Sequence, residues 1–172
     1  MKKEDSQGIF KQIMGDYPTG VTIVTTTKED GTPVGLTVNS FASVSLDPLM
    51  LLWSIDHRVS SLKEFTDRGK FAVHVLAEEQ KELCQTFASK HEDRFSTCNW
   101  ELSSNGLPII EGALGVFECK TFKAIEAGDH TVLIGEVLDL KVNKEKDPML
   151  YHRRVFGAIP KEFYNQKQSV PN

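Results

Sequence analysis

Hydroxyl and amide side chains gather in one short stretch of the sequence, between Thr37 and Ser45. Side chains alternate between the two faces of a strand, so a single strand here would have one face rich in polar groups. That face would carry Thr37, Asn39, Phe41, Ser43 and Ser45. Hydroxyls and neighbouring backbone N–H groups bind phosphate without a large positive charge. The stretch therefore predicts a phosphate-binding strand, while ordinary β-forming threonines on a half-solvated face give the same pattern.

The histidines are the next candidates, and they are spread singly at His57, His74, His91, His130 and His152. Because no H-E-x-x-H run or paired Cys/His spacing occurs, we expect no metal site. His130 stands apart, since Gly128-Asp129 predicts a turn that presents its imidazole at the start of a strand. The chain also lacks G-x-S-x-G and the glycine-rich loops of Rossmann and P-loop proteins. No acid–base pair or nucleophile stands out.

The elements that must position these residues are mostly strands. β-Branched and apolar runs predict strands at residues 20–27, 32–38, 49–55, 71–76, 113–125 and 130–142, with hairpin turns at Asp30-Gly31 and Gly128-Asp129. Helical spacing predicts a short amphipathic helix over Ile9–Met14, a second from a serine cap at Ser60 or Ser61 to near Gly69, and a third over Glu79–Ser89. Many strands and few helices predict a mainly β fold, a closed or nearly closed antiparallel barrel with peripheral helices.

Length and composition limit what this barrel does. The chain has 172 residues, so we expect one domain over residues 1–164, followed by a polar tail at 165–172. A net charge of −4 argues against nucleic-acid binding. Three widely spaced cysteines, an odd number, suit a reducing compartment. We find no secretory leader, and the apolar run at 49–55 is too short to span a membrane, so the sequence predicts a cytoplasmic protein.

Several motifs, in order along the chain, resemble one known family. They are Tyr17-Pro-Thr-Gly-Val-Thr-Ile-Val-Thr-Thr26, the run from Gly35 to Pro48, Phe71-Ala-Val-His-Val-Leu76, Phe87-Ala-Ser89 with Asp93-Arg-Phe95, Ala127-Gly-Asp-His130 and Tyr151-His-Arg-Arg-Val-Phe-Gly157. The set is similar to the flavin reductase family, which supplies reduced flavin to two-component monooxygenases. The match covers nearly the whole chain from Asp16 to Gly157.

The resemblance implies an FMN-binding split β-barrel, Greek-key-like, that forms a homodimer and binds FMN, or FAD, near the dimer interface. It places Thr37, Val38, Asn39 and Ser40 along the isoalloxazine and ribityl chain, with Ser43 nearby. It also brings the segment from His57 through Ser60 and Ser61 to the flavin phosphate, with Arg94 as a phosphate partner. At position 62, two residues after Ser60, this chain has Leu62 where many relatives have a small or hydroxyl-bearing residue. Structural explanations remain for each: a helix cap for Ser60, a surface cation for Arg94 and a turn for Asn39.

The same resemblance places His130 near the nicotinamide cofactor, where it would hold the pyrophosphate or carboxamide. It places Tyr151 and Arg153 in a C-terminal motif that closes over the site or pairs with the second subunit. A lone histidine with a purely structural role and a plain plug at the barrel end are the alternatives for these positions.

The function that the resemblance implies is hydride transfer from NADH or NADPH to FMN or FAD, with reduced flavin passing to a monooxygenase. This chemistry belongs to the two cofactors, so the protein needs no catalytic side chain of its own and has only to stack the rings and exclude water. One alternative is an electron carrier that keeps FMN tightly and exchanges electrons with a protein partner. Another is a non-catalytic barrel for a different phosphate-bearing small molecule.

Overall fold

A computed structural model describes residues 3–164 of the chain, so the polar tail expected at 165–172 lies outside the described residues. The strands are β1 (Thr22–Thr27), β2 (Pro33–Val38), β3 (Ala42–Leu46), β4 (Leu49–Asp56), β5 (Lys70–Val75), β6 (Trp100–Leu102), β7 (Pro108–Ile110), β8 (Gly115–Ala127), β9 (His130–Val142), β10 (Met149–His152) and β11 (Val155–Ala158). The helices are α1 (Lys3–Asp16), α2 (Leu62–Asp67) and α3 (Lys81–Ala88), with 3-10 turns η1 (Phe95–Thr97) and η2 (Lys161–Phe163). No helix in this range is long and apolar enough to cross a membrane.

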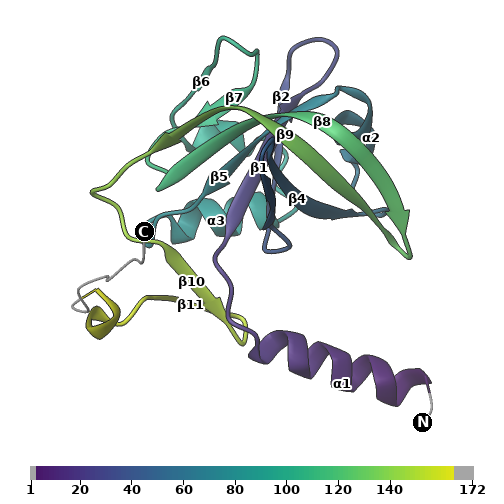
Figure 1. Cartoon of the computed structure of the whole chain (residues 1–172), viewed down its shortest axis with the longest axis vertical. Coiled ribbons are helices and arrows are strands. Elements are labelled where there is room, and N and C mark those ends of the chain that lie inside the picture. Colours follow the sequence, from purple (N-terminus) through teal and green to yellow (C-terminus); the bar gives the residue numbers. More distant parts are fainter. Residues whose placement is uncertain (1–2, 165–172) are drawn as a thin grey trace.

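A 7-stranded antiparallel sheet forms the body of the protein, in the order β2-β1-β5-β8-β9-β4-β3. The sheet curls so that β8 and β9 cross in front of β1 and β5, and α1 lies apart from it beside the β10–β11 hairpin (Figure 1). Although β2 and β3 follow each other in sequence, they are the two edge strands of the ladder. The mainly β antiparallel prediction is confirmed, and the sheet has a gap between these two edges.

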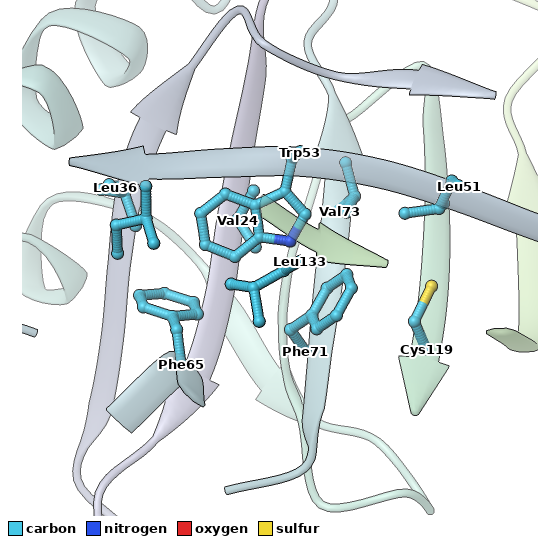
Figure 2. Close-up of a cluster of buried hydrophobic side chains, with 10 residues drawn as sticks. Val24, Leu36, Leu51, Trp53, Phe65, Phe71, Val73, Cys119 and Leu133 are labelled. Atoms are coloured by element: carbon cyan, nitrogen blue, oxygen red, sulfur yellow. The ribbon is translucent and has the colours of Figure 1, made fainter. Parts of the chain in front are cut away.

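The core inside the curled sheet is built on the alternation of β4. Leu51, Trp53 and Ile55 point inward and are buried, while the residues between them are partly exposed. The Trp53 ring meets Phe65 of α2 and Phe71 of β5 edge-on, with centroids 5.1 and 5.7 Å apart (Figure 2). Such aromatic contacts add to the large apolar area that the three rings bury. This cluster fixes α2 against the sheet.

The polar stretch from Thr37 to Ser45 is not one strand, so that prediction was wrong. β2 ends at Val38, opposite Thr22, where β1 begins and pairing with β1 stops. The chain then crosses to a different partner, because the Ser40 hydroxyl binds the backbone of β4. The side chains on the two sides of this crossing therefore do not alternate along a single strand. β3 pairs with β4 in a register of its own.

The helices agree with the sequence in place but differ in detail. α2 ends before Gly69, whose φ of +71° turns the chain into β5. Ser61 stands at the N-cap of α2, yet its side chain makes no cap hydrogen bond, so the predicted serine cap is wrong there. Its backbone lies outside the extended region that capping residues normally adopt. The hairpin turn predicted at Gly128-Asp129 is confirmed, with Gly128 at φ +66°.

His74 is the most deeply buried titratable group that bridges separate elements. Its ring, on β5, is fully buried, and Nδ1 makes a 3.1 Å hydrogen bond with the Ile23 carbonyl of β1. The Ile110 N–H of β7 donates to Nε2 at 3.1 Å. Both contacts are satisfied by the neutral ring with its proton on Nδ1. Burial lowers the pKa of His74 from 6.5 to about 4.

We therefore expect the free energy of unfolding to fall as the pH drops from about 6.5 to about 4. Over this range His74 becomes protonated in the unfolded chain but stays neutral in the folded protein. The free energy of unfolding should therefore be lower by on the order of 3 kcal/mol at pH 4. Urea titrations at a series of pH values measure the loss. Comparison with His74→Gln isolates it, and His91→Gln, at an exposed position, is the control. Identical pH slopes for wild type and His74→Gln would contradict the assignment.

Candidate functional site

Two hollows lie near the crossing between β2 and β3. The first, which we call the Asn39 pocket, has a volume of about 210 Å³. It is lined by the end of β2, by α3 and by the β10–β11 hairpin, through Val21, Thr37, Val38, Asn39, Cys84, Ala88, Tyr151 and Phe156. The Tyr151 and Phe156 rings lie 5.2 Å apart, and the Asn39 amide is polar. Apolar and aromatic walls with one amide suit a flat, heteroaromatic ligand.

The side chains of the Asn39 pocket offer no strong acid, base or nucleophile. The Thr37 hydroxyl donates to the Cys84 carbonyl at 2.7 Å, which fastens β2 to α3. Burial raises the pKa of the Cys84 thiol to about 11, so the thiol stays protonated and a poor nucleophile. A ligand in this pocket would therefore meet walls that can orient it and no reacting group from the protein.

The second hollow, the His57 groove, is larger, with a volume of about 740 Å³. It lies between the segment leading into α2 and the far end of the β8–β9 hairpin. Its lining residues are His57, Val59, Ser60, Leu62, Lys63, Thr66, Ala124, Glu126 and Thr131. The His57 N–H donates to the Asp129 carbonyl at 3.0 Å, and its Nε2 makes a 3.1 Å hydrogen bond with the Thr131 hydroxyl. These contacts hold the His57 ring in one orientation.

The end of β4 leads from the contact with Ser40, the neighbour of Asn39, to His57 of the groove. The Ser40 hydroxyl donates to the Ser54 carbonyl at 3.1 Å and accepts from the Ser54 N–H at 3.0 Å. Ser40 thus takes the place of a strand partner just beyond the last residue that β3 pairs with, Leu52. From Ser54 to His57 the strand advances roughly 10 Å, at about 3.3 Å per residue. A ligand that lies along this edge could reach from one hollow to the other.

The structure brings together some of the predicted site residues. Thr37, Val38 and Asn39 line the Asn39 pocket with Tyr151, and Ser40 follows directly. Ser60 lines the His57 groove, and Ser61 follows it at the start of α2. Ser43 is exposed on the edge strand β3.

Arg94 lines neither hollow. Its guanidinium donates from Nη1 to the Gly35 carbonyl at 2.6 Å and from Nη2 to the Ser89 carbonyl. The Nε of Arg94 is buried without a partner among the described residues. Burial lowers the pKa of Arg94. The side chain thus ties the chain after α3 to the middle of β2, next to the strand end that forms the Asn39 pocket.

His130 also lies outside both hollows, at the first residue of β9. Its Nδ1 makes a 2.7 Å hydrogen bond with Asp129, and this bond lowers the pKa of the Asp129 carboxyl. Asp56 of β4 pairs with His130 across the ladder. Because successive side chains alternate, His130 faces away from Thr131 and the His57 groove. Its imidazole is partly exposed on that face.

Arg153 stands at the tip of the β10–β11 hairpin. Arg153 and Arg154 have φ values of 49° and 64°, a left-handed conformation that is costly for residues other than glycine. An ion pair to Asp16 and a 3.0 Å hydrogen bond from the Arg153 N–H to the Gly15 carbonyl hold this tip against the end of α1. These contacts position Tyr151 at the Asn39 pocket.

Other lining residues were not predicted. Phe156 falls inside the C-terminal motif and was the easiest to infer from it. Cys84 and Ala88 come from the helix predicted at Glu79–Ser89, whose inner face follows from its apolar spacing. Lys63, Glu126 and Thr131 carry no motif, because α2 and the β8–β9 hairpin that bring them together are far apart in sequence.

Replacing Ser40 by Ala should destabilise the protein by about 1–3 kcal/mol, because it leaves the N–H and carbonyl of Ser54 without their partner. Urea denaturation of the variant and wild type measures the difference. Ser43→Ala is the matched control, since the Ser43 side chain is exposed, and we expect a change within about 0.5 kcal/mol. Equal effects of the two substitutions would show that the Ser40 contact contributes nothing.

Comparison with known proteins identifies the chain's relatives. The model of the flavin reductase like domain matches residues 14–160. The chain is 48% identical over 128 residues to the reductase component of the flavin-dependent trigonelline monooxygenase of Acinetobacter baylyi, covering 74% of this chain and 41% of that protein. It is 40% identical over 153 residues to the FMN reductase (NADH) SmoA of Agrobacterium fabrum, covering 89% of this chain and 86% of that protein.

A solved structure shares the fold at similar length. Nitrilotriacetate monooxygenase component B from Mycobacterium thermoresistibile superposes with a TM-score of 0.88 and 34% identity, covering 99% of this chain and 93% of that chain. The family predicted from the sequence motifs and the split-barrel fold are thereby confirmed. The chain belongs to the flavin reductase-like domain family.

Proposed function

We propose that the protein is a flavin reductase that transfers hydride from NADH or NADPH to FMN or FAD. The observation that carries this proposal is the Asn39 pocket, which has apolar and aromatic walls and no acid or base. Bound flavin would supply an electron-accepting ring that takes up hydride from the nicotinamide. The residues of the chain have only to bind, orient and keep water from the two rings. The Agrobacterium relative, named an FMN reductase that uses NADH, supports the same conclusion.

The flavin would lie along the edge that joins the two hollows. Thr37, Val38 and Asn39 would face the isoalloxazine, and Ser40 would hold β4 in place beneath the ribityl chain. Ser60 and Ser61, at the start of α2, would approach the phosphate. The ribityl chain would run along the roughly 10 Å of chain between Ser54 and His57.

The remaining predicted residues receive different tasks in this proposal. Arg94 acts as a positioning residue, because its guanidinium holds main-chain carbonyls of β2 and the α3 end. His130 would contact the nicotinamide cofactor from the outer face of the β8–β9 turn. Tyr151 would cover the isoalloxazine, and Arg153 would hold that cover in place through Asp16. Ser43, which is exposed on β3, would lie only at the outer edge of the flavin site.

Reduced flavin would leave for a separate monooxygenase. The Acinetobacter relative is named as the reductase component of such an enzyme, and the solved Mycobacterium structure is named as a monooxygenase component. In the strand order, β2 and β3 are unpaired edges, which is compatible with a site that opens to release the reduced ring.

We also propose that two copies form a homodimer. The volume of the Asn39 pocket, about 210 Å³, lies below the range of about 300–1,000 Å³ typical of small-molecule sites, so its walls need completion. α1 also presents an apolar face that the single chain leaves uncovered. Its residues are Ile9 (47% exposed), Phe10 (67%), Ile13 (63%) and Met14 (49%). An uncovered apolar helix face of this kind commonly marks a subunit contact.

The activity is tested by following NADH and NADPH oxidation with free FMN and with free FAD. We expect steady turnover with at least one pair, and replacement of His130 by Ala should raise the Michaelis constant for the nicotinamide while leaving flavin affinity nearly unchanged. His91→Ala, at an exposed position, is the control. Tight flavin binding without nicotinamide oxidation would contradict the reductase and indicate an electron carrier. Equal losses for both ligands in the His130 variant would indicate a structural role for the histidine.

The dimer is tested by light scattering during size-exclusion chromatography. Wild type should have twice the 19.3 kDa mass of one chain, and Phe10→Asp should shift the mass toward one chain, because a carboxylate on the apolar face of α1 opposes its burial. Gln12→Asp adds the same charge beside that face and should leave the mass unchanged. A single-chain mass for wild type would refute the proposal.

A further inference from the structure

The His57 groove is larger than a flavin phosphate requires. Its volume of about 740 Å³ falls within the range of about 300–1,000 Å³ that accommodates whole small molecules. Ser60 occupies only one part of its lining, and the groove continues between α2 and the β8–β9 hairpin. A lone phosphate at Ser60 would leave most of this space to water.

The two charged side chains of the groove come from different walls. Lys63 projects from α2, and Glu126 from β8. Both are exposed, and among the described residues neither forms an ion pair. The Lys63 ammonium is a donor suited to a phosphate ester, and the Glu126 carboxylate accepts from hydroxyl or amino groups, as acidic residues do for ribose. The groove thus offers one positive and one negative side chain, from two different elements, to a ligand.

The lining of the groove also includes an imidazole ring and apolar side chains. The His57 ring is held by the Thr131 hydroxyl and by its own backbone hydrogen bond to Asp129. Leu62 of α2 and Ala124 of β8 supply apolar atoms to the lining. Purine bases stack on fixed aromatic side chains, histidine included, and such stacking does not depend on a particular base.

We propose that the His57 groove is an adenylate subsite, in which Lys63 binds the phosphate, the His57 ring supports the base and Glu126 accepts from the ribose or the adenine amino group. The proposal rests on the proposed function, because both FAD and NADH carry an adenylate that FMN and nicotinamide mononucleotide lack. Lys63 and Glu126 would then favour the binding of dinucleotides over that of mononucleotides.

Binding of AMP alone tests the subsite without any turnover. Isothermal titration of the full chain should show one saturable AMP site, and Lys63→Gln should weaken it about tenfold, the loss expected for one charge-assisted hydrogen bond. Glu126→Gln should weaken it less. Lys28→Gln, in the β1–β2 turn, is the matched control and should bind AMP as wild type does. Absence of AMP binding, or inorganic phosphate binding as tightly as AMP, would overturn the proposal.

The source of the adenylate is distinguished by Michaelis constants measured on Lys63→Gln. A rise of about tenfold for FAD with FMN unchanged assigns the groove to the flavin. The same rise for NADH, with reduced nicotinamide mononucleotide unchanged, assigns it to the hydride donor. Equal rises in the Michaelis constants for FAD and FMN would show that Lys63 binds only the flavin phosphate, and would contradict the adenylate subsite. If no flavin supports NADH oxidation, the proposed reductase function is wrong. The AMP titration still tests the adenylate subsite in that case.

Discussion

The hydrogen bonds between the Ser40 hydroxyl and the backbone of Ser54 determine how the curled sheet ends. A sheet edge leaves N–H and carbonyl groups without partners, and each unpaired group that is removed from water is costly. Here one side chain satisfies both groups on β4 at the point where β3 has already diverged. The chain can therefore leave β1, cross an open gap and still begin β3 in a fixed register.

The two hollows follow from that crossing. On one side, β2 ends against α3 and the β10–β11 hairpin, and the result is a small pocket with aromatic walls. On the other side, β4 leads through Asp56 into the His57 segment, which the β8–β9 turn holds by a backbone hydrogen bond. Neither hollow contains a strongly activated side chain. The arrangement suits a reaction in which the reacting groups arrive with the ligands and the protein controls distance, orientation and water.

Much of this architecture was predictable from the sequence, for physical reasons. β9 was predicted with the bounds that the structure gives, because Gly128-Asp129 punctuates one end and the strand pattern is long. The Thr37–Ser45 stretch was mispredicted, because its alternation hides a change of partner that only the contact with Ser54 explains. The contacts of Arg94 and the position of Lys63 in the groove were equally impossible to predict from the sequence. Carbonyls from Gly35 and Ser89 meet at Arg94, and the walls of the Lys63 groove come from α2 and the β8–β9 hairpin.

We have proposed that flavin lies along the edge that joins the Asn39 pocket to the His57 groove. A crystal structure of the protein soaked with FMN tests it most directly. We expect electron density for the isoalloxazine against Thr37, Val38 and Asn39, with the phosphate directed along β4 toward Ser60. Flavin bound elsewhere, for example on the outer face of β8 around Phe122, would contradict it.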